Sequence, residues 1–202
     1  MHTEDFDKKQ HLNVKNIAIF ASGSGSNARK ILEYFEDIPE VEVSIIITNK
    51  KNAGVLSHAN EFDIPSMKID RSYFYESECI LEVLKAENVD LIVLAGFLWL
   101  IPPYLITSFP NRIVNIHPSL LPKYGGKGMY GRYVHQAVKE NNELESGLTI
   151  HFVNEKFDEG GHIFQASCAL SPTDSPEEIA AKVLQLEHKH YAEVIHSVLK
   201  EI

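Results

Sequence analysis

The first two thirds of the chain alternates between two kinds of hydrophobic pattern. Short runs that are apolar almost throughout occupy residues 16–21, 41–48, 65–69, 89–95 and 112–116. Between them, apolar residues recur at helical spacing over residues 27–35, 53–61 and 73–87. Strands without a polar face are typical of a parallel sheet that is buried on both sides. We therefore expect an α/β fold with a doubly wound, mostly parallel sheet and helices on both faces, as in Rossmann-like proteins.

The last third of the chain follows a different pattern. Residues 148–153 and 162–170 are strand-like and are joined by a polar loop with two glycines, so we expect them to add antiparallel or mixed strands. Ser175 and Pro176 then begin a long helix, because a hydroxyl cap and an early proline suit a helix N-terminus. The face that we expect this helix to bury consists of Ile179, Val183, Leu186, His190, Val194 and Val198.

The composition is that of an ordinary globular protein. Of the 202 residues, 44% are hydrophobic and 23% are charged. This length favours one domain, which we place at residues 14–202, and the polar residues 1–13 are expected to be a flexible tail. No segment has the ~20 apolar residues of a membrane helix. Cys79 and Cys168 form no paired motif, so we interpret them as reduced thiols of a cytoplasmic protein.

The net charge limits the partners. A formal charge of -9 disfavours nucleic-acid binding, so the expected partners are small molecules, with a monomer and a homodimer both left open. The charge still permits a local anion site built from backbone amides. His188 and His190 are two apart on a predicted helix and do not share a face, so no metal site is expected.

A glycine-rich turn, Gly23-Ser24-Gly25-Ser26-Asn27, follows the first strand and begins the first helix. Backbone amides at a helix N-terminus favour an anion such as a phosphate, although a plain strand-to-helix turn remains an alternative. Gly23, Gly25 and Ala28 also match the dinucleotide fingerprint. That fingerprint needs an acidic residue after the second strand, where this chain has Thr-Asn-Lys-Lys at residues 48–51, so a nicotinamide cofactor is disfavoured.

The end of the fifth apolar run carries an amide and an imidazole. Asn115 and His117 are two apart, so within a strand they point to the same face. Ligands of open α/β sheets lie beyond the carboxyl ends of the strands, where these two groups could hold a carbonyl oxygen. Asp158, in a loop between the last two strands, could approach the imidazole and raise its pKa. A surface histidine and a turn-forming aspartate are the simpler alternatives.

From residue 16 to the C-terminal helix, the chain resembles the glycinamide ribonucleotide formyltransferases of purine synthesis. The most specific segments of this resemblance are residues 22–27, 93–97, 115–124 and His151-Phe152-Val153 with Asp158. The family fold, a parallel sheet with helices on both faces, agrees with the hydrophobic pattern. The reaction that the resemblance implies is the direct attack of the amine of glycinamide ribonucleotide on the formyl group of 10-formyltetrahydrofolate, without a metal.

The resemblance also assigns roles by position. The implied catalytic residues are Asn115, His117 and Asp158. Asn115 would donate to the oxyanion, protonated His117 would stabilise it, and Asp158 would keep His117 charged and help to remove the amine proton. The implied ribonucleotide-binding residues are Gly25, Ser26, Asn27, Pro118 and Glu187. The implied folate-binding residues are Leu98, Trp99, Leu100, Ile101, Asn115, Asn154, Glu155, Lys156, Phe157 and Asp158.

The chain departs from the family pattern near the folate tail. Trp99 stands where many members have an arginine, and Tyr73, with Arg71 close by, aligns with another family arginine. The loop at residues 125–132 is rich in glycine and longer than in the shorter family form, so it is either a mobile lid or a plain flexible loop.

Three other function classes remain as alternatives. A tRNA or sugar formyltransferase and a formyltetrahydrofolate hydrolase would share the folate site. The tRNA enzyme carries a further RNA-binding barrel, which we do not expect in a chain that ends at Ile202. The hydrolase carries an N-terminal regulatory domain, which we do not expect from about 15 residues before the first strand. A non-enzymatic nucleotide-binding protein would use the glycine turn and would not depend on His117.

Overall fold

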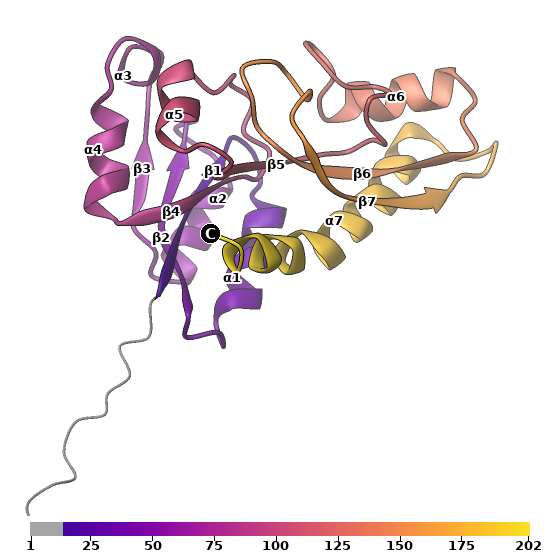
Figure 1. Cartoon of the computed structure of the whole chain (residues 1–202). Coiled ribbons are helices and arrows are strands. Elements are labelled where there is room, and N and C mark those ends of the chain that lie inside the picture. Colours follow the sequence, from indigo (N-terminus) through magenta and orange to yellow (C-terminus); the bar gives the residue numbers. More distant parts are fainter. Residues whose placement is uncertain (1–13) are drawn as a thin grey trace, which may run out of the picture.

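The computed structural model describes residues 14–202, which form a seven-stranded sheet in the order β3-β2-β1-β4-β5-β6-β7 (Figure 1). The expected tail at residues 1–13 lies outside the described residues. The strands are β1 (Lys15–Ala21), β2 (Val41–Thr48), β3 (Ser66–Lys68), β4 (Val89–Leu94), β5 (Ile113–His117), β6 (Glu145–Phe152) and β7 (His162–Ala169). The helices are α1 (Ser26–Phe35), α2 (Val55–Glu61), α3 (Arg71–Tyr75), α4 (Cys79–Ala86), α5 (Pro103–Ser108), α6 (Arg132–Glu140) and α7 (Pro176–Leu199).

Strand direction changes toward one end of the sheet. Strands β1 to β5 are parallel, whereas β6 pairs antiparallel with both β5 and β7. The added antiparallel strands confirm the mixed C-terminal third that the sequence predicts. Within residues 14–202, no helix is both long enough and apolar enough to cross a membrane.

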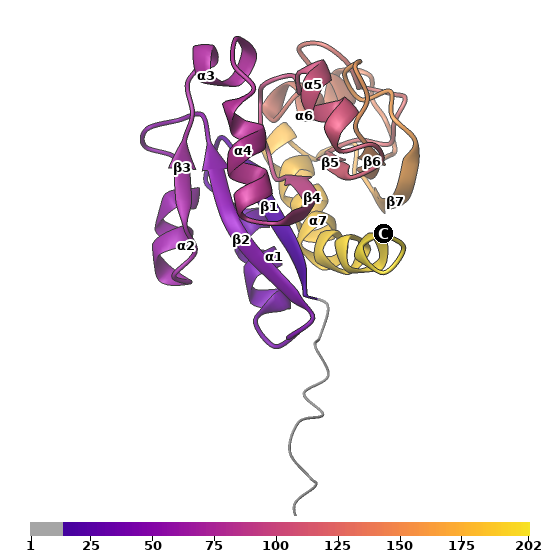
Figure 2. The same cartoon turned by 60° about the vertical axis from the view of Figure 1, so that its left-hand side comes forward.

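Different helices cover the two faces of the sheet (Figures 1 and 2). In β1, Ile17 and Ile19 belong to a core shared with α1, α2, α6 and α7, whereas Ala18 and Phe20 belong to a second core shared with α3, α4 and α5. Alternate residues of a strand point to opposite faces. All four side chains are fully buried because helices cover both faces. The expected doubly wound α/β fold with helices on both faces is confirmed.

Several helices differ from the sequence-based expectation. Residues 73–87 were expected to form one helix but form α3 and α4. The Asp70 carboxylate caps α3 by accepting from the Tyr73 amide, and the Ser77 hydroxyl donates to the Tyr73 carbonyl, the group that would continue the helix. Helices α5 and α6 were not predicted. Helix α5 has only six residues, too few for a clear helical pattern. Helix α6 begins after Gly131, which has a φ of 52° and no side chain that could cap the helix.

The long C-terminal helix α7 begins with the expected cap but buries a different face. Ser175 and Glu178 form a reciprocal capping box. Leu186, His190 and Val194 are only half-buried, whereas Glu187, Tyr191 and Ile195 are buried. The expected face is confirmed at Ile179, Val183 and Val198, which are buried. It was wrong at the other three positions because it was drawn mainly through apolar residues, while the buried face includes two polar side chains that find partners inside the protein.

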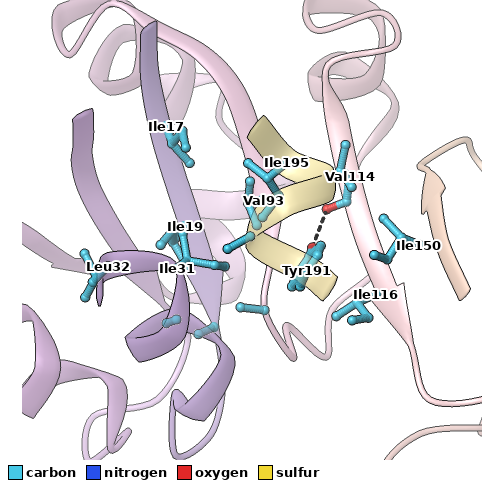
Figure 3. Packing of buried hydrophobic residues seen from close by; sticks show 14 of the residues in the cluster. Ile17, Ile19, Ile31, Leu32, Val93, Val114, Ile116, Ile150, Tyr191 and Ile195 are labelled. Carbon is cyan, nitrogen blue, oxygen red and sulfur yellow. Dashed lines mark hydrogen bonds between the residues drawn. The ribbon is translucent and has the colours of Figure 1, made fainter. Parts of the chain in front are cut away.

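Tyr191 fastens α7 to the centre of the sheet (Figure 3). Its ring is 1% exposed, and its hydroxyl lies 2.9 Å from the Leu94 carbonyl oxygen of β4 and 3.3 Å from the Val114 carbonyl oxygen of β5. Leu94 is the last residue of β4, and Val114 lies beside it in the neighbouring strand β5. The hydroxyl therefore holds α7 in register with the edge of the sheet where ligands of this fold class bind.

Tyr191→Phe removes this hydroxyl and its hydrogen bonds to two buried carbonyl groups of the sheet. We expect a loss of about 1–3 kcal/mol in the free energy of unfolding, measured by urea denaturation. Tyr133→Phe, at a ring that is half exposed, is the matched control and should change stability by less than about 0.5 kcal/mol. Equal stability of Tyr191→Phe and the unsubstituted protein would show that the two contacts contribute nothing.

Candidate active site

A cavity of about 590 Å³ lies beyond the carboxyl ends of β1, β4 and β5. The strand order reverses between β1 and β4, and such a switch point is where open α/β sheets bind their ligands. The cavity wall includes the turn after β1, the segment after β4, the end of β5, the end of β6 and one face of α7. Segments that are far apart in the sequence thus contribute to one site.

The three expected catalytic residues all line this cavity. Asn115 and His117 point to one face of β5, as predicted, and His117 is only 4% exposed. Asp158 lies in the loop after β6, and its Oδ2 is 3.5 Å from His117 Nδ1. The Gly126 amide donates to the same carboxylate oxygen at 2.9 Å, which fixes the carboxylate beside the imidazole. The structure therefore brings together an amide, an imidazole and a carboxylate from two distant segments.

A second imidazole, that of His151, connects Asn115 with Asp158. Its Nε2 lies 3.1 Å from Asn115 Nδ2 and 3.6 Å from Asp158 Oδ1. His151 stands opposite Asn115 in the antiparallel β5–β6 ladder and is 2% exposed. The segment His151-Phe152-Val153 contributes to the resemblance to the family, but His151 was not predicted as a site residue. Strand pairing, which places the two side chains together, cannot be read from the local sequence.

The bonds of His117 determine which ring nitrogen carries the proton. Nε2 lies 2.8 Å from the Tyr124 carbonyl oxygen, which can only accept, so Nε2–H donates. In the neutral ring, Nδ1 therefore presents its lone pair toward Asp158. Burial lowers the pKa of His117, while the Asp158 charge and the bond to Tyr124 raise it, and the net shift is downward. Asp158 thus raises this pKa as the sequence predicts, but burial outweighs the carboxylate, so the net direction favours the neutral ring.

The carboxylate of Asp158 stays ionised. Burial raises its pKa, but the nearby His151 and His117 rings and the hydrogen bond from the Gly126 amide together bring the pKa below its ordinary value. A charged carboxylate beside a neutral imidazole can stabilise a proton that arrives on that imidazole. Among residues 14–202, no cluster of three or more histidine, cysteine, aspartate or glutamate side chains is arranged to hold a metal ion.

A buried polar network holds the turn that follows β5. The Thr149 hydroxyl donates to the Ser119 carbonyl at 2.7 Å and accepts from the Leu121 amide at 3.0 Å. The Ser119 hydroxyl in turn donates to the Lys123 carbonyl at 2.6 Å. These bonds fix the chain up to the Tyr124 carbonyl, and they therefore fix the tautomer of His117.

The glycine turn forms the expected helix N-terminus. Gly25 has a φ of 79°, and a Cβ there would meet Val55 at 2.7 Å, so a side chain at this position is excluded. The amides of the first turn of α1 have no partner within the helix. Gly23 and Asn27 line the cavity, as does Glu187, which accepts from Asn27 Nδ2 at 2.6 Å. Gly25 and Ser26 lie behind this wall and do not line the cavity.

Most of the remaining predicted residues form a second part of the cavity wall. Those that line the cavity are Leu98, Trp99, Leu100, Ile101, Pro118, Asn154, Lys156 and Phe157, whereas Glu155 does not. The Arg71 guanidinium lies 5.2 Å from the centre of the Trp99 ring. The glycine-rich loop before α6 also borders the cavity. The buried side chain of His135 in α6 borders it too, although His135 was not predicted as a site residue. One wall is thus mainly apolar and the other carries polar groups around a helix N-terminus.

Comparison with known proteins gives a consistent result. Residues 15–195 match the formyl transferase family. The chloroplastic phosphoribosylglycinamide formyltransferase of Arabidopsis thaliana is 43% identical over 193 residues, which are 93% of this chain but 66% of that protein. The Haemophilus influenzae phosphoribosylglycinamide formyltransferase is 37% identical over 90% of this chain and 86% of its own. A crystal structure of the Anaplasma phagocytophilum enzyme of that name has a TM-score of 0.85 at 29% identity, covering 93% of this chain and 88% of its own.

The buried Glu187 generates a test of the site's electrostatics. Burial raises its pKa above the ordinary 4.5, and the Asn27 amide offsets this only in part. The folded protein therefore binds the proton more tightly than the unfolded chain, and stability falls as pH rises from the unfolded to the folded pKa. We expect Glu187→Gln to raise the Tm by a few degrees at pH 8 and by progressively less toward pH 4. The control is Glu193→Gln, at an exposed position of α7. A gain that grows toward low pH would contradict this account.

Proposed function

The chain belongs to the formyl transferase family, and we propose that it transfers a formyl group from 10-formyltetrahydrofolate to the amine of glycinamide ribonucleotide in purine synthesis. The observation that carries this proposal is the meeting of Asn115, His117 and Asp158 beside the N-terminus of α1 in one cavity. The names of the relatives support the choice of the ribonucleotide as the acceptor.

The two walls of the cavity suit the two substrates. On the polar wall, Gly23 and Asn27 line the cavity at the start of α1, where backbone amides suit a phosphate, and the carboxylate of Glu187 and the side-chain amide of Asn27 suit sugar hydroxyls. The apolar wall of Trp99, Leu100 and Phe157 suits a flat heterocycle, and the bound formyl folate would supply an activated acyl group there. Folate binding was expected at residues 98–101 and 154–158. Most of these residues line the cavity, so we propose that role for them.

His117 accepts the proton of the attacking amine, and Asp158 stabilises the charge that this creates on the ring. Burial lowers the pKa of His117 overall, which favours the neutral ring in the free protein. Its Nδ1 can therefore accept a proton as the amine adds to the formyl carbon, either directly or through one water. The new charge lies beside the Asp158 carboxylate, so a repulsion between a lone pair and an anion becomes an ion pair.

Asn115 stabilises the charge that develops on the formyl oxygen. Its Nδ2 has two hydrogens, of which one is directed at His151. The second can donate to the oxygen as it becomes negative, and a donor that is already fixed in place stabilises such a charge. The imidazolium that forms at His117 adds to this stabilisation. When the tetrahedral intermediate collapses, the bond between the formyl carbon and the folate nitrogen breaks, and His117 returns its proton to that leaving nitrogen.

The wider predictions remain part of the proposal. We propose that residues 14–202 act as a single domain and that the protein works in the cytoplasm on small molecules, without nucleic acid, membrane or metal. The two cysteines, Cys79 and Cys168, are free thiols, which supports a reducing compartment. The name of the Arabidopsis relative places that protein in the chloroplast.

A direct assay separates the proposed reaction from its alternatives. The purified protein is mixed with 10-formyltetrahydrofolate and glycinamide ribonucleotide, and the folate absorbance is followed. We expect turnover only when both are present. Formate release without the amine would indicate the hydrolase, and tight nucleotide binding without turnover would indicate the non-enzymatic alternative.

Removal of a catalytic group should reduce turnover without abolishing ribonucleotide binding. Asn115→Ala removes the donor to the developing oxyanion, and we expect kcat to fall about 100- to 1,000-fold. His117→Ala and Asp158→Asn should also abolish most of the transfer. Calorimetry should find ribonucleotide affinity largely unchanged, because the phosphate site lies at α1. Near-normal turnover in any of the three variants would remove that residue from the mechanism.

The pH dependence follows from the two opposing effects on His117. Its pKa should lie below the ordinary 6.5, so kcat/KM should fall as the pH drops through that folded-state pKa and Nδ1 becomes occupied. Asp158→Asn removes the charge that raises the pKa, so the imidazole should titrate at still lower pH. Histidine NMR titration of both proteins checks this. A pKa that rises in Asp158→Asn would contradict the assignment.

A further inference from the structure

His151 has bonds that define how its ring is protonated. Its Nδ1 lies 2.8 Å from the Phe152 carbonyl oxygen, which has no hydrogen to give, so Nδ1 carries the proton. The neutral ring then has its lone pair on Nε2, the atom that faces Asn115 Nδ2 at 3.1 Å. An acceptor at this position requires the amide to present its nitrogen. The backbone of β6 therefore fixes the tautomer of His151, and the tautomer fixes the orientation of the Asn115 amide.

We propose that His151 is a positioning residue that holds the Asn115 amide with its N–H groups toward the formyl oxygen. The proposal rests on the transfer reaction proposed above. An amide turned by 180° would place Oδ1 where the N–H is needed, and an oxygen there would repel the developing negative charge. Among residues 14–202, the Asn115 side chain has no other hydrogen bond that would distinguish the two orientations.

The distances favour Asn115 over Asp158 as the group through which His151 acts. Nε2 is within hydrogen-bond distance of Asn115, whereas Asp158 Oδ1 lies 3.6 Å away, beyond a normal hydrogen bond. The Asp158 carboxylate is already held by the Gly126 amide at 2.9 Å. Asn115 and His151 are also direct partners in the β5–β6 ladder, so their separation is set by the sheet.

Two substitutions of His151 separate its acceptor from its bulk. In His151→Gln the new side-chain oxygen extends to the position of Nε2, whereas in His151→Asn it reaches only the position of Nδ1. We expect kcat to fall about tenfold in His151→Asn, the factor that corresponds to one hydrogen bond, and to stay within about threefold in His151→Gln. KM for both substrates and the Tm should change little between the two. His162→Gln, at the exposed cross-strand neighbour on β7, is the matched control.

A double-mutant cycle identifies the group through which His151 acts. If it acts through Asn115, His151→Asn should cause no further loss of kcat in an Asn115→Ala protein. Additive losses, or coupling to Asp158→Asn in place of Asn115→Ala, would overturn the proposal while leaving the proposed reaction intact. Full activity of Asn115→Ala would instead overturn the role of Asn115 and, with it, that of His151.

A readout without turnover guards against a loss that is merely structural. One side-chain amide proton of Asn115 should exchange slowly with solvent, because His151 accepts it, and the signal is assigned by its absence in Asn115→Ala. The protection should persist in His151→Gln and disappear in His151→Asn. Equal exchange in the two variants would contradict the positioning role.

Discussion

The contact between His117 and Asp158 is the interaction on which the rest of the site depends. Asp158 Oδ2 lies 3.5 Å from His117 Nδ1, a contact that is most favourable when the ring carries a second proton, and the protein holds this arrangement from both sides. Tyr124 fixes the tautomer of His117, and the Gly126 amide fixes Asp158. The folded chain therefore positions both partners, and in the proposed mechanism their contact becomes favourable when the amine of the substrate gives up its proton.

The parallel and the antiparallel strands position different parts of the site. The parallel strands bring the glycine turn after β1 and the apolar segment after β4 to one edge of the sheet. The antiparallel strand β6 runs back along β5, and it thereby sets His151 opposite Asn115 and delivers Asp158 at its end. Tyr191 of α7 bonds to carbonyls of β4 and β5, and Glu187, one turn earlier, reaches Asn27. One helix therefore connects the catalytic strand with the anion site.

Much of this could be predicted from the sequence, for identifiable reasons. The apolar runs predict the strands because burial on both faces leaves no polar alternation, and the residues at 115 and 117 share a face because of strand periodicity. Local patterns could not predict the break between α3 and α4, which depends on the Ser77 hydroxyl, or the buried face of α7, which depends on partners for Glu187 and Tyr191. The net pKa shift of His117 depends on burial, and the role of His151 depends on strand pairing, so both required the folded structure.

A crystal structure with glycinamide ribonucleotide and an unreactive folate analogue would test the central claim most directly. The account predicts the phosphate on the amides at the start of α1, the amine within about 2.6–3.2 Å of His117 Nδ1 or of a water that it binds, and the carbonyl oxygen of the analogue facing Asn115 Nδ2. A ribonucleotide whose phosphate lies away from α1, or whose amine faces away from His117 and Asp158, would contradict it.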